Sequence, residues 1–266
     1  MIVNDLGGAV DGTGNDKSHA QQVVDEIKAI GGEAVVNGDD VSSWDGAKNM
    51  IDQAVETFGT LDVVVNNAGI LRDRMLVNMT EDEWDSVIQV HLKGTFAPSR
   101  HAASYWRQKS KDTGEKVNAR IINTSSTSGL YGNVGQTNYG AAKAGIAAFT
   151  IIAARELGRI GVTVNSISPT AYTRMTDTLR EYTEEDIERR DPRWVSPTIV
   201  YLSSAEANDI TGRVIQAGNG RVAVCEGWRR GAEIDQIEDV EAIGPLIRDM
   251  ISNVRKNSGM DGLELD

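Results

Sequence analysis

Short apolar runs alternate with stretches of helical periodicity along most of this chain, and this alternation limits the folds open to it. The apolar runs lie near residues 1–5, 34–36, 61–65, 117–124 and 162–167. Between the first two runs, Val23, Val24, Ile27 and Ile30 have the spacing of one helix face. Strands that alternate with helices predict a parallel sheet with helices on both faces and right-handed crossovers. We therefore expect an α/β fold with a doubly wound parallel sheet.

Polar or turn-forming residues end the predicted strands. In an open parallel sheet, ligands bind at the carboxyl ends of the strands. We therefore expect one edge of the sheet to be lined by Asp5, Asp40, Asn67, Ser126 and Pro169.

The clearest chemical pattern is a strand, a Gly-rich turn and a helix between residues 121 and 157. Tyr139 and Lys143 are four residues apart, so they share one face of the helix. A free phenol has a pKa of roughly 10, and a neighbouring ammonium group lowers that pKa towards neutrality. Ser126 can return to the same place if the strand end and the helix start face one cleft. These three residues predict an acid/base site for a carbonyl/alcohol pair.

Composition argues against several classes of function. The net charge of -12 and the pI near 4.8 argue against nucleic acid and anionic membranes as partners, because both need a basic surface. We interpret the acidity itself as a property of solubility. The single cysteine, Cys225, excludes an intramolecular disulfide, and the three histidines show no metal-ligand pattern, so no metal site is expected. Without a leader-like segment or a long apolar run, the expected location is the cytoplasm.

Several of these residues together carry a family resemblance. The run from Asn66 to Gly69, then Ser126, the Tyr139–Lys143 pair and Pro169 resemble the short-chain dehydrogenase/reductase family in order and spacing. The resemblance covers residues 1–220 and implies a Rossmann-like sheet. A narrower resemblance, to the dehydrogenase units of peroxisomal multifunctional enzymes type 2 and to bacterial hydroxyacyl-CoA or hydroxysteroid relatives, rests on residues 4–8, 90–92 and 131–133.

The resemblance implies hydride transfer between a nicotinamide cofactor and a secondary alcohol or ketone. Tyr139 would donate or accept the proton at the substrate oxygen, and Ser126 would orient that oxygen. Lys143 would lower the pKa of Tyr139 and hold the nicotinamide ribose. The further cofactor contacts implied by the resemblance are Asp40 and Val41 at the adenine, Asn67, Ala68 and Gly69 along the cofactor, and Pro169 and Thr173 at the carboxamide.

Asp5 bears on the choice between NAD and NADP. A carboxylate at this strand end can accept hydrogen bonds from the adenosine ribose hydroxyls, and it repels a 2′-phosphate. Leu6 and Gly7 follow it, so no basic side chain would neutralise a phosphate. NAD is therefore expected rather than NADP. The alternative is an Asp that only forms the turn before the glycines.

The sequence departs from the family pattern in two places. It lacks the first strand and the Gly-x-x-x-Gly-x-Gly turn that hold the pyrophosphate, so the sheet should have two unpaired edges. An N-terminally truncated sequence and a protein that has lost cofactor binding both explain this, and the complete set of catalytic positions favours the first. His91 stands where many members have Asn, either as part of a proton relay or as a packed core residue.

Two further expectations concern organisation. We expect a dehydrogenase domain over residues 1–226 and a polar extension over residues 227–266, with one amphipathic helix between residues 237 and 254. The apolar helix at residues 144–154 lies either deep in the core or in a subunit interface, and the resemblance implies a homodimer or homotetramer. The expected partner is a small-molecule substrate. The alternative function is a non-catalytic paralogue or partner subunit.

Overall fold

Two separate sheets are formed by the strands of the computed structural model, which describes residues 1–14, 18–173, 176 and 181–265. β1 and β2 pair in parallel, and the second sheet has the order β3-β4-β5-β6-β7. Within the described residues, no strand joins β1 to β3, so both have an unpaired edge, as expected from the missing Gly-rich segment. The strands are β1 Ile2–Asn4, β2 Val35–Asn37, β3 Val63–Asn66, β4 Ala119–Thr124, β5 Val162–Thr170, β6 Val214–Gly218 and β7 Arg221–Cys225.

The α/β class and the parallel sheet are confirmed, with one addition at the far edge. Strands β3 to β6 are mutually parallel, whereas β7 runs antiparallel to β6. Asn219 and Gly220 both have positive φ (51° and 75°), which is the geometry of a tight hairpin turn. The Asn-Gly pair is a hairpin signal that sequence reasoning passed over, and β7 was missed for that reason.

Capping residues mark the ends of several helices. Ser43 caps α2, which ends before Gly59, and Thr80 forms a capping box with Glu83 at the start of α3. Pro98 lies inside α4, and the helical irregularity is a π-helical segment, Gln89–Lys93, just before that helix. The α-helices are α1 Ser18–Ala29, α2 Trp44–Phe58, α3 Glu81–Ile88, α4 Gly94–Thr113, α5 Thr127–Leu130, α6 Thr137–Leu157, α7 Glu184–Arg189, α8 Ser196–Ser203 and α9 Val240–Ser252.

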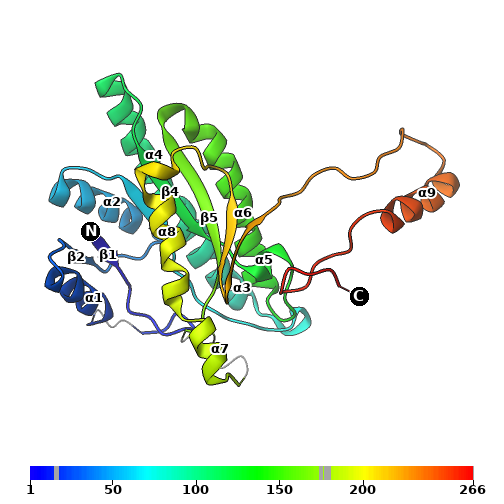
Figure 1. Cartoon of the computed structure of the whole chain (residues 1–266), viewed down its shortest axis with the longest axis horizontal. Helices are drawn as coiled ribbons and strands as arrows, with labels where there is room; N and C mark the ends of the chain where they lie inside the picture. The colour runs from blue at the N-terminus through cyan, green and yellow to red at the C-terminus, as the bar shows by residue number, and fades with distance from the viewer. Residues whose placement is uncertain (15–17, 174–175, 177–180, 266) are drawn as a thin grey trace.

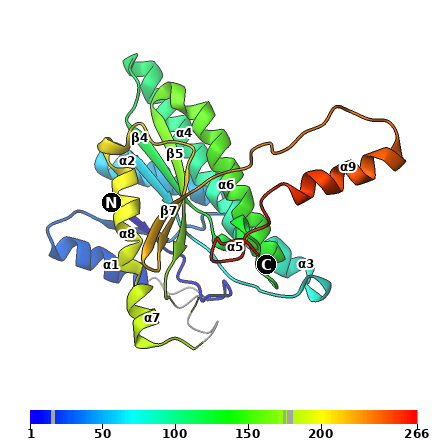
Figure 2. The same ribbon diagram turned by 45° about the vertical axis from the view of Figure 1, so that its right-hand side comes forward.

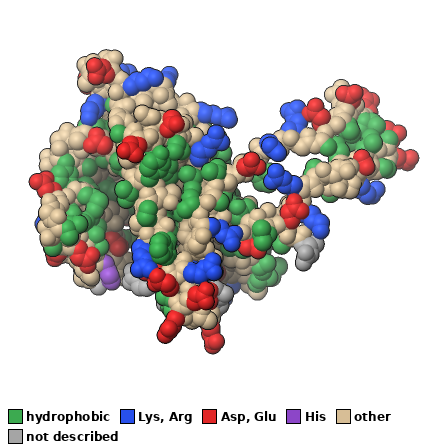
Figure 3. Space-filling model, in the orientation of Figure 1, with side chains coloured by type: hydrophobic (Ala, Val, Ile, Leu, Met, Phe, Trp, Pro, Cys, Tyr) green, Lys and Arg blue, Asp and Glu red, His purple; other side chains and the backbone are tan. Residues whose placement is uncertain are grey.

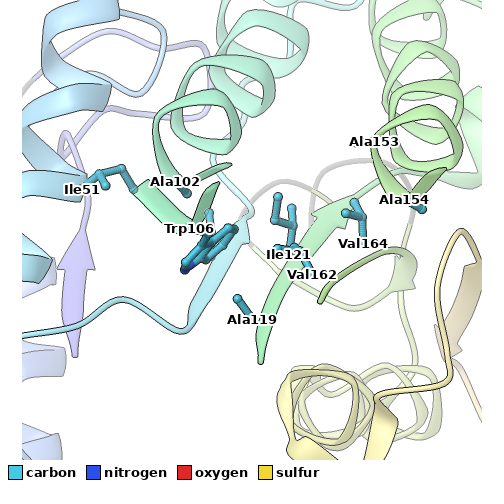
Figure 4. Packing of buried hydrophobic residues seen from close by; sticks show 10 residues of the cluster. Ile51, Ala102, Trp106, Ala119, Ile121, Ala153, Ala154, Val162 and Val164 are labelled. Carbon is cyan, nitrogen blue, oxygen red and sulfur yellow. The ribbon is translucent and has the colours of Figure 1, made fainter. Parts of the chain in front are cut away.

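The core lies on both faces of β4, an interior strand of the larger sheet. Ile121 belongs to a cluster with Trp106 of α4 (Figure 4). Its neighbour Ile122 belongs to a second cluster, with Leu202 of α8. Successive strand residues point to opposite faces, so the two clusters show that helices cover both sides of the sheet. Figure 1 shows α4 and α6 on one side and α8 on the other.

The chain leaves the body after β7. Figures 1 and 2 show α9 standing away from the sheet at the end of a long connection, and Figure 3 shows hydrophobic side chains gathered on it. The chain then returns, and Arg221 donates a hydrogen bond to the carbonyl oxygen of Asp261. No described helix combines the length and the apolar character needed to cross a membrane.

Candidate active site

The residues expected at the strand ends do lie at the carboxyl ends of their strands. Ser126 follows β4 by two residues, Asn67 follows β3 directly, and Pro169 is the second-last residue of β5. Because these three strands are parallel, their carboxyl ends share one edge of the larger sheet. Asp5 and Asp40 follow β1 and β2, which form the smaller sheet.

Ser126, Tyr139 and Lys143 are brought together by the contact between α5 and α6. Ser126 is the N-cap of α5, where its Oγ accepts a hydrogen bond from the amide of Ser128 at 3.2 Å. Gly129 allows the close approach of the two helices, because a Cβ there would lie 2.5 Å from the backbone nitrogen of Ala144. The hydroxyl of Ser126 is close enough to the Tyr139 hydroxyl to lower the pKa of the phenol.

Lys143 is buried and ties α6 to the end of β4. Its Nζ donates a hydrogen bond to the carbonyl oxygen of Thr124 at 2.7 Å. In the other direction, the hydroxyl of Ser125 donates to the carbonyl oxygen of Lys143 at 2.8 Å. The ammonium nitrogen also lies 5.5 Å from the centroid of the Tyr139 ring. Burial lowers the pKa of Lys143 to about 7, so its amino group gains and loses a proton near neutral pH.

The expectation that Lys143 lowers the pKa of Tyr139 is wrong for this structure. Burial raises the pKa of Tyr139, this effect outweighs the opposite effect of Ser126, and the negative charge of Asp73 raises the pKa further. Lys143 does not reverse the balance, because its Nζ is directed at the carbonyl oxygen of Thr124 and burial disfavours its own charge. The phenol is therefore held in its protonated form.

His91 lies against Tyr139 from the π-helical segment. The two rings are edge to face, with centroids 5.1 Å apart. His91 Nε2 lies 2.8 Å from the carbonyl oxygen and 3.1 Å from the amide nitrogen of Ile70, and burial together with the charge of Lys143 lowers the pKa of His91 to about 3. Within the described part of the chain, its buried Nδ1 has no hydrogen-bond partner. His91 is thus a neutral, packed residue that touches the site.

The two carboxylates at the ends of β1 and β2 differ in what they offer a ligand. Asp5 Oδ1 accepts a hydrogen bond from the amide of Gly7 at 2.7 Å, and Oδ2 has no hydrogen-bond partner in the described ranges. One oxygen of Asp5 can therefore accept from a ribose hydroxyl, as the adenosine end of a nicotinamide cofactor requires. In Asp40, Oδ1 accepts from both the amide and the hydroxyl of Ser42 at 2.8 Å, so Asp40 also shapes its own turn.

The remaining predicted cofactor residues have varied surroundings. Asn67 and Ala68 are exposed at the end of β3, and Val41 packs on Gly94 at the start of α4. Gly69 is in contact with His91, and a Cβ at Gly69 would overlap the imidazole. Pro169, near the end of β5, and Thr173, three residues after that strand, are both partly buried. The exposed strand ends and the free oxygen of Asp5 fit a nucleotide cofactor, and no metal-ligand cluster occurs among the described side chains.

Sequence reasoning missed a polar network beside Tyr139. Gln136 is buried, its Nε2 donates to Asp73 at 2.7 Å, and its Oε1 accepts from Ser128 at 2.7 Å. Asn138 is buried as well and donates to the backbone carbonyl oxygen of Arg72 at 2.9 Å. The available signal was the polar run Gln-Thr-Asn directly before Tyr139, which a solvent-exposed turn would explain equally well.

Comparisons with known proteins agree with this geometry. Residues 5–186 match the sequence profile of the family described as short chain dehydrogenase. A hydroxyacyl-CoA dehydrogenase of Mycobacterium tuberculosis is 46% identical over 223 residues, which cover 80% of this chain and 68% of that protein. Mouse peroxisomal multifunctional enzyme type 2 is 40% identical over 86% of this chain, but the match spans 29% of the mouse protein.

The comparison with solved structures gives the same result. A short chain dehydrogenase from Mycobacterium avium superposes with a TM-score of 0.85 and 49% sequence identity. The superposition covers 97% of this chain and 87% of that one. The similarity therefore extends over both sheets and the helices around them.

Proposed function

Because this chain belongs to the short-chain dehydrogenase family, we propose that it is an NAD-dependent oxidoreductase that transfers hydride between nicotinamide and a secondary alcohol or its ketone. Enzymes of the family act on CH–OH groups with nicotinamide cofactors. The observation that carries the proposal is the convergence of Ser126, Tyr139 and Lys143 at the carboxyl end of β4.

The proposed roles follow from the contacts of each residue. When bound, the nicotinamide supplies or accepts the hydride. In the direction of reduction, the Tyr139 hydroxyl gives its proton to the substrate oxygen, and the neighbouring hydroxyl of Ser126 holds that oxygen. Lys143, whose pKa is about 7, can return a proton to the site at neutral pH. Burial keeps the phenol protonated until substrate arrives, which suits a proton donor.

NAD is proposed as the cofactor on account of Asp5. One of its carboxylate oxygens can accept from the adenosine ribose hydroxyls, and its charge would repel a 2′-phosphate. The next residues, Leu6 and Gly7, carry no positive charge. Asp40, Val41, Asn67, Ala68, Gly69, Pro169 and Thr173 are proposed as the further cofactor contacts.

A 3-hydroxyacyl thioester is the proposed substrate. Support comes from the named activity of the 46% identical hydroxyacyl-CoA dehydrogenase, and from a 3-oxoacyl-[acyl-carrier-protein] reductase of Staphylococcus aureus that is 41% identical over 77% of this chain. The first name describes a hydroxyl group on an acyl-CoA, and the second describes an oxo group at the third carbon of an acyl chain. The alternative substrate is a hydroxysteroid-type secondary alcohol, on which Ser126, Tyr139 and Lys143 would act in the same way.

The test is a direct assay. Purified protein is mixed with NAD and 3-hydroxybutyryl-CoA, NADH formation is followed at 340 nm, and NADP replaces NAD in a parallel reaction. We expect turnover with NAD that the Tyr139→Phe variant does not show. Absence of turnover with both cofactors, over a panel of hydroxyacyl thioesters and hydroxysteroids, would contradict the proposal.

A non-catalytic partner subunit is the second candidate. The observation that favours it is the division into two sheets, because no described strand joins β1 to β3 and the Gly-x-x-x-Gly-x-Gly turn that would hold a pyrophosphate is not found among the described residues. NADH fluorescence separates the candidates: an enzyme binds NADH with a saturable change in emission, whereas a partner subunit of this kind does not.

A homodimer is proposed from the outer face of α6. Ala144, Ala148 and Ile152 lie one turn apart and are exposed, so they form an apolar stripe on a helix whose other face is buried. A second copy of the chain would cover this stripe. We also propose that residues 1–226 form the catalytic domain and that residues 227–266 form a separate extension.

A further inference from the structure

Asn138 is a fully buried asparagine in the first turn of α6, directly before Tyr139. Its Nδ2 donates hydrogen bonds to the backbone carbonyl oxygens of Arg72 and Glu83, each at 2.9 Å. Its Oδ1 accepts from the backbone amide of Tyr139 at 2.7 Å. Breaking any of these bonds would leave a buried polar group unpaired, so the side chain of Asn138 holds the three segments in one arrangement.

The bond to Tyr139 supplies a partner that the helix itself lacks. The first amides of a helix have no carbonyl oxygen one turn earlier to which they can donate. Within the described residues, the side chain of Gln136, which precedes α6, makes no capping hydrogen bond. Asn138 Oδ1 accepts from the amide of Tyr139 instead. The backbone of the proposed proton-transferring residue is therefore held by the side chain of Asn138.

The two bonds from Nδ2 join the first turn of α6 to the chain that follows β3. Arg72 lies three residues after Gly69, in the segment that begins with the predicted cofactor residues. Glu83 lies in the first turn of α3, the next α-helix along the chain. Asn138 thus connects Tyr139 to the cofactor segment, by which we mean residues 67–72.

The cofactor segment also contacts the loop that follows β1. The amide of Leu71 donates to the carbonyl oxygen of Val10 at 2.9 Å, and Arg72 Nε donates to the carbonyl oxygen of Asp11 at 3.2 Å. No described strand joins the two sheets, so these loop contacts link the region after Asp5 to the cofactor segment. The bonds of Asn138 continue this link to α6.

We propose that Asn138 is a positioning residue, which fixes Tyr139 relative to the cofactor segment. The inference rests on the proposed function, in which Tyr139 exchanges a proton with the substrate and residues 67–69 contact the cofactor. Hydride and proton transfer at one substrate need both partners in fixed places, and a small displacement lowers the rate strongly. Loss of Asn138 should therefore slow turnover. Cofactor binding should persist, because the cofactor segment keeps its contacts with the loop after β1.

Two substitutions divide the role of Asn138 into its parts. Asn138→Ala removes both the acceptor for the Tyr139 amide and the donors to Arg72 and Glu83. Asn138→Asp has nearly the same size and keeps an oxygen for the Tyr139 amide, but it loses at least one of the two donors. A carboxylate is also favourable in the first turn of a helix, so the Asp variant should fold.

Asn165→Ala is the matched control. Asn165 is an equally buried asparagine, on β5, whose Nδ2 donates to the carbonyl oxygen of Ile210 at 2.7 Å. Its Oδ1 accepts from the backbone amide of Arg213 at 3.1 Å. These bonds hold β5 to the segment before β6. The control therefore reports what the loss of a buried, fully bonded asparagine does to turnover when Tyr139 is not its partner.

The first readout is turnover of 3-hydroxybutyryl-CoA with NAD. The rate is divided by the concentration of NADH-binding sites from a fluorescence titration, so that unfolded protein does not count. Asn138→Ala and Asn138→Asp should each lower kcat per site about 10- to 100-fold and leave the Kd for NADH unchanged. Asn165→Ala should keep the wild-type kcat per site.

The second readout needs no turnover. It is the exchange of the Tyr139 amide proton with deuterium, followed by NMR of protein labelled with ¹⁵N-tyrosine, and the Tyr139→Phe spectrum identifies the signal. Exchange should be about tenfold faster in Asn138→Ala, because the amide loses its acceptor. In Asn138→Asp, which keeps the acceptor, exchange should stay close to that of the wild type.

Three results would each overturn the inference: wild-type kcat per site in Asn138→Ala, an equal loss of kcat in Asn165→Ala, or unchanged exchange of the Tyr139 amide in Asn138→Ala. If Asn138→Ala does not fold, kcat per site in Asn138→Asp decides in its place. Absence of turnover in the wild type would count against the proposed function, and the amide exchange would still decide whether Asn138 holds Tyr139.

Discussion

The imidazole of His91 meets the phenol ring of Tyr139 edge to face, with the ring planes at 89° and the centroids 5.1 Å apart. On its other side the imidazole is in contact with Gly69, one residue before Ile70, whose backbone holds His91 Nε2. The predicted cofactor residue and the proton donor are therefore linked through one buried ring. A larger side chain at Gly69 would therefore displace His91 and, through it, the ring of Tyr139.

Gly69→Ala is expected to lower both stability and activity. The added Cβ would lie 2.3 Å from His91 Cε1, and the imidazole is buried, with 2% of the residue exposed. Overpacking of this kind costs typically about 1–3 kcal/mol of unfolding free energy, and displacement of Tyr139 should reduce kcat at least tenfold. Urea unfolding and steady-state kinetics measure the two effects.

Gly158→Ala is the control for that experiment. Gly158 has helical φ and ψ, and no atom lies within 4 Å of a Cβ built there. It should retain wild-type activity and stability. Equal behaviour of the two alanine variants would show that the contact between Gly69 and His91 does not constrain the site.

Tyr139→Phe removes one oxygen atom and is expected to remove most of the turnover. General acid–base catalysis by a positioned group contributes typically about 10² to 10⁴ in rate, and the ring of Phe would keep the packing against His91. NADH binding, followed by fluorescence, should remain near that of the wild type. Tyr201→Phe, on the exposed side of α8, is the matched control. Turnover near the wild-type level in Tyr139→Phe would refute the assignment of the proton donor.

Much of the fold could be predicted because local signals agree with the tertiary structure. The caps at Ser43 and Thr80, the stop at Gly59 and the fully buried run of β4 each depend on neighbouring residues in the sequence. The position of the predicted site then follows, because the carboxyl ends of parallel strands lie along the same edge of a sheet. The hairpin strand β7 was missed although its Asn219-Gly220 turn was visible, because its flanking run is short and exposed.

Spacing predicts that Ser126, Tyr139 and Lys143 lie together, and it does not predict their electrostatics. The pKa of Tyr139 depends on burial, to which the distant residue His91 contributes by ring contact, and on the charge of Asp73. Spacing cannot show that Lys143 donates to the carbonyl oxygen of Thr124. The hydrogen-bond network of Gln136 could not be predicted either, because the partners of Gln136 come from three separate segments of the chain.

Ala148→Glu is expected to disrupt the proposed homodimer. Ala148 is the middle residue of the exposed apolar stripe on α6, and burying an unpaired carboxylate in an interface is strongly unfavourable. Size-exclusion chromatography with light scattering should give a mass of twice 28.8 kDa for the wild type and 28.8 kDa for the variant. Gln108→Glu adds the same charge on an exposed position of α4 and should remain dimeric. A monomeric wild type would contradict the proposal.

Lys143→Met is expected to stabilise the protein at pH 7 while it abolishes turnover. The pKa of Lys143 is about 7 in the folded state against an ordinary value of 10.5, so between these values the unfolded state binds more protons, and stability rises with pH. Between pH 7 and pH 9.5 the free energy of unfolding of the wild type should rise by about 3 kcal/mol because of Lys143, since the proton that favours the unfolded state is progressively lost.

Lys143→Met should lack this rise in the free energy of unfolding, whereas Lys111→Met, which replaces an exposed lysine of α4, should keep it. Urea unfolding at the two pH values gives the difference, and contributions from other titrating groups cancel between variants. The same pH dependence in wild type and Lys143→Met would mean that Lys143 is fully charged in the folded state; its place in the site would then rest on ion pairing with the phenolate rather than on proton exchange.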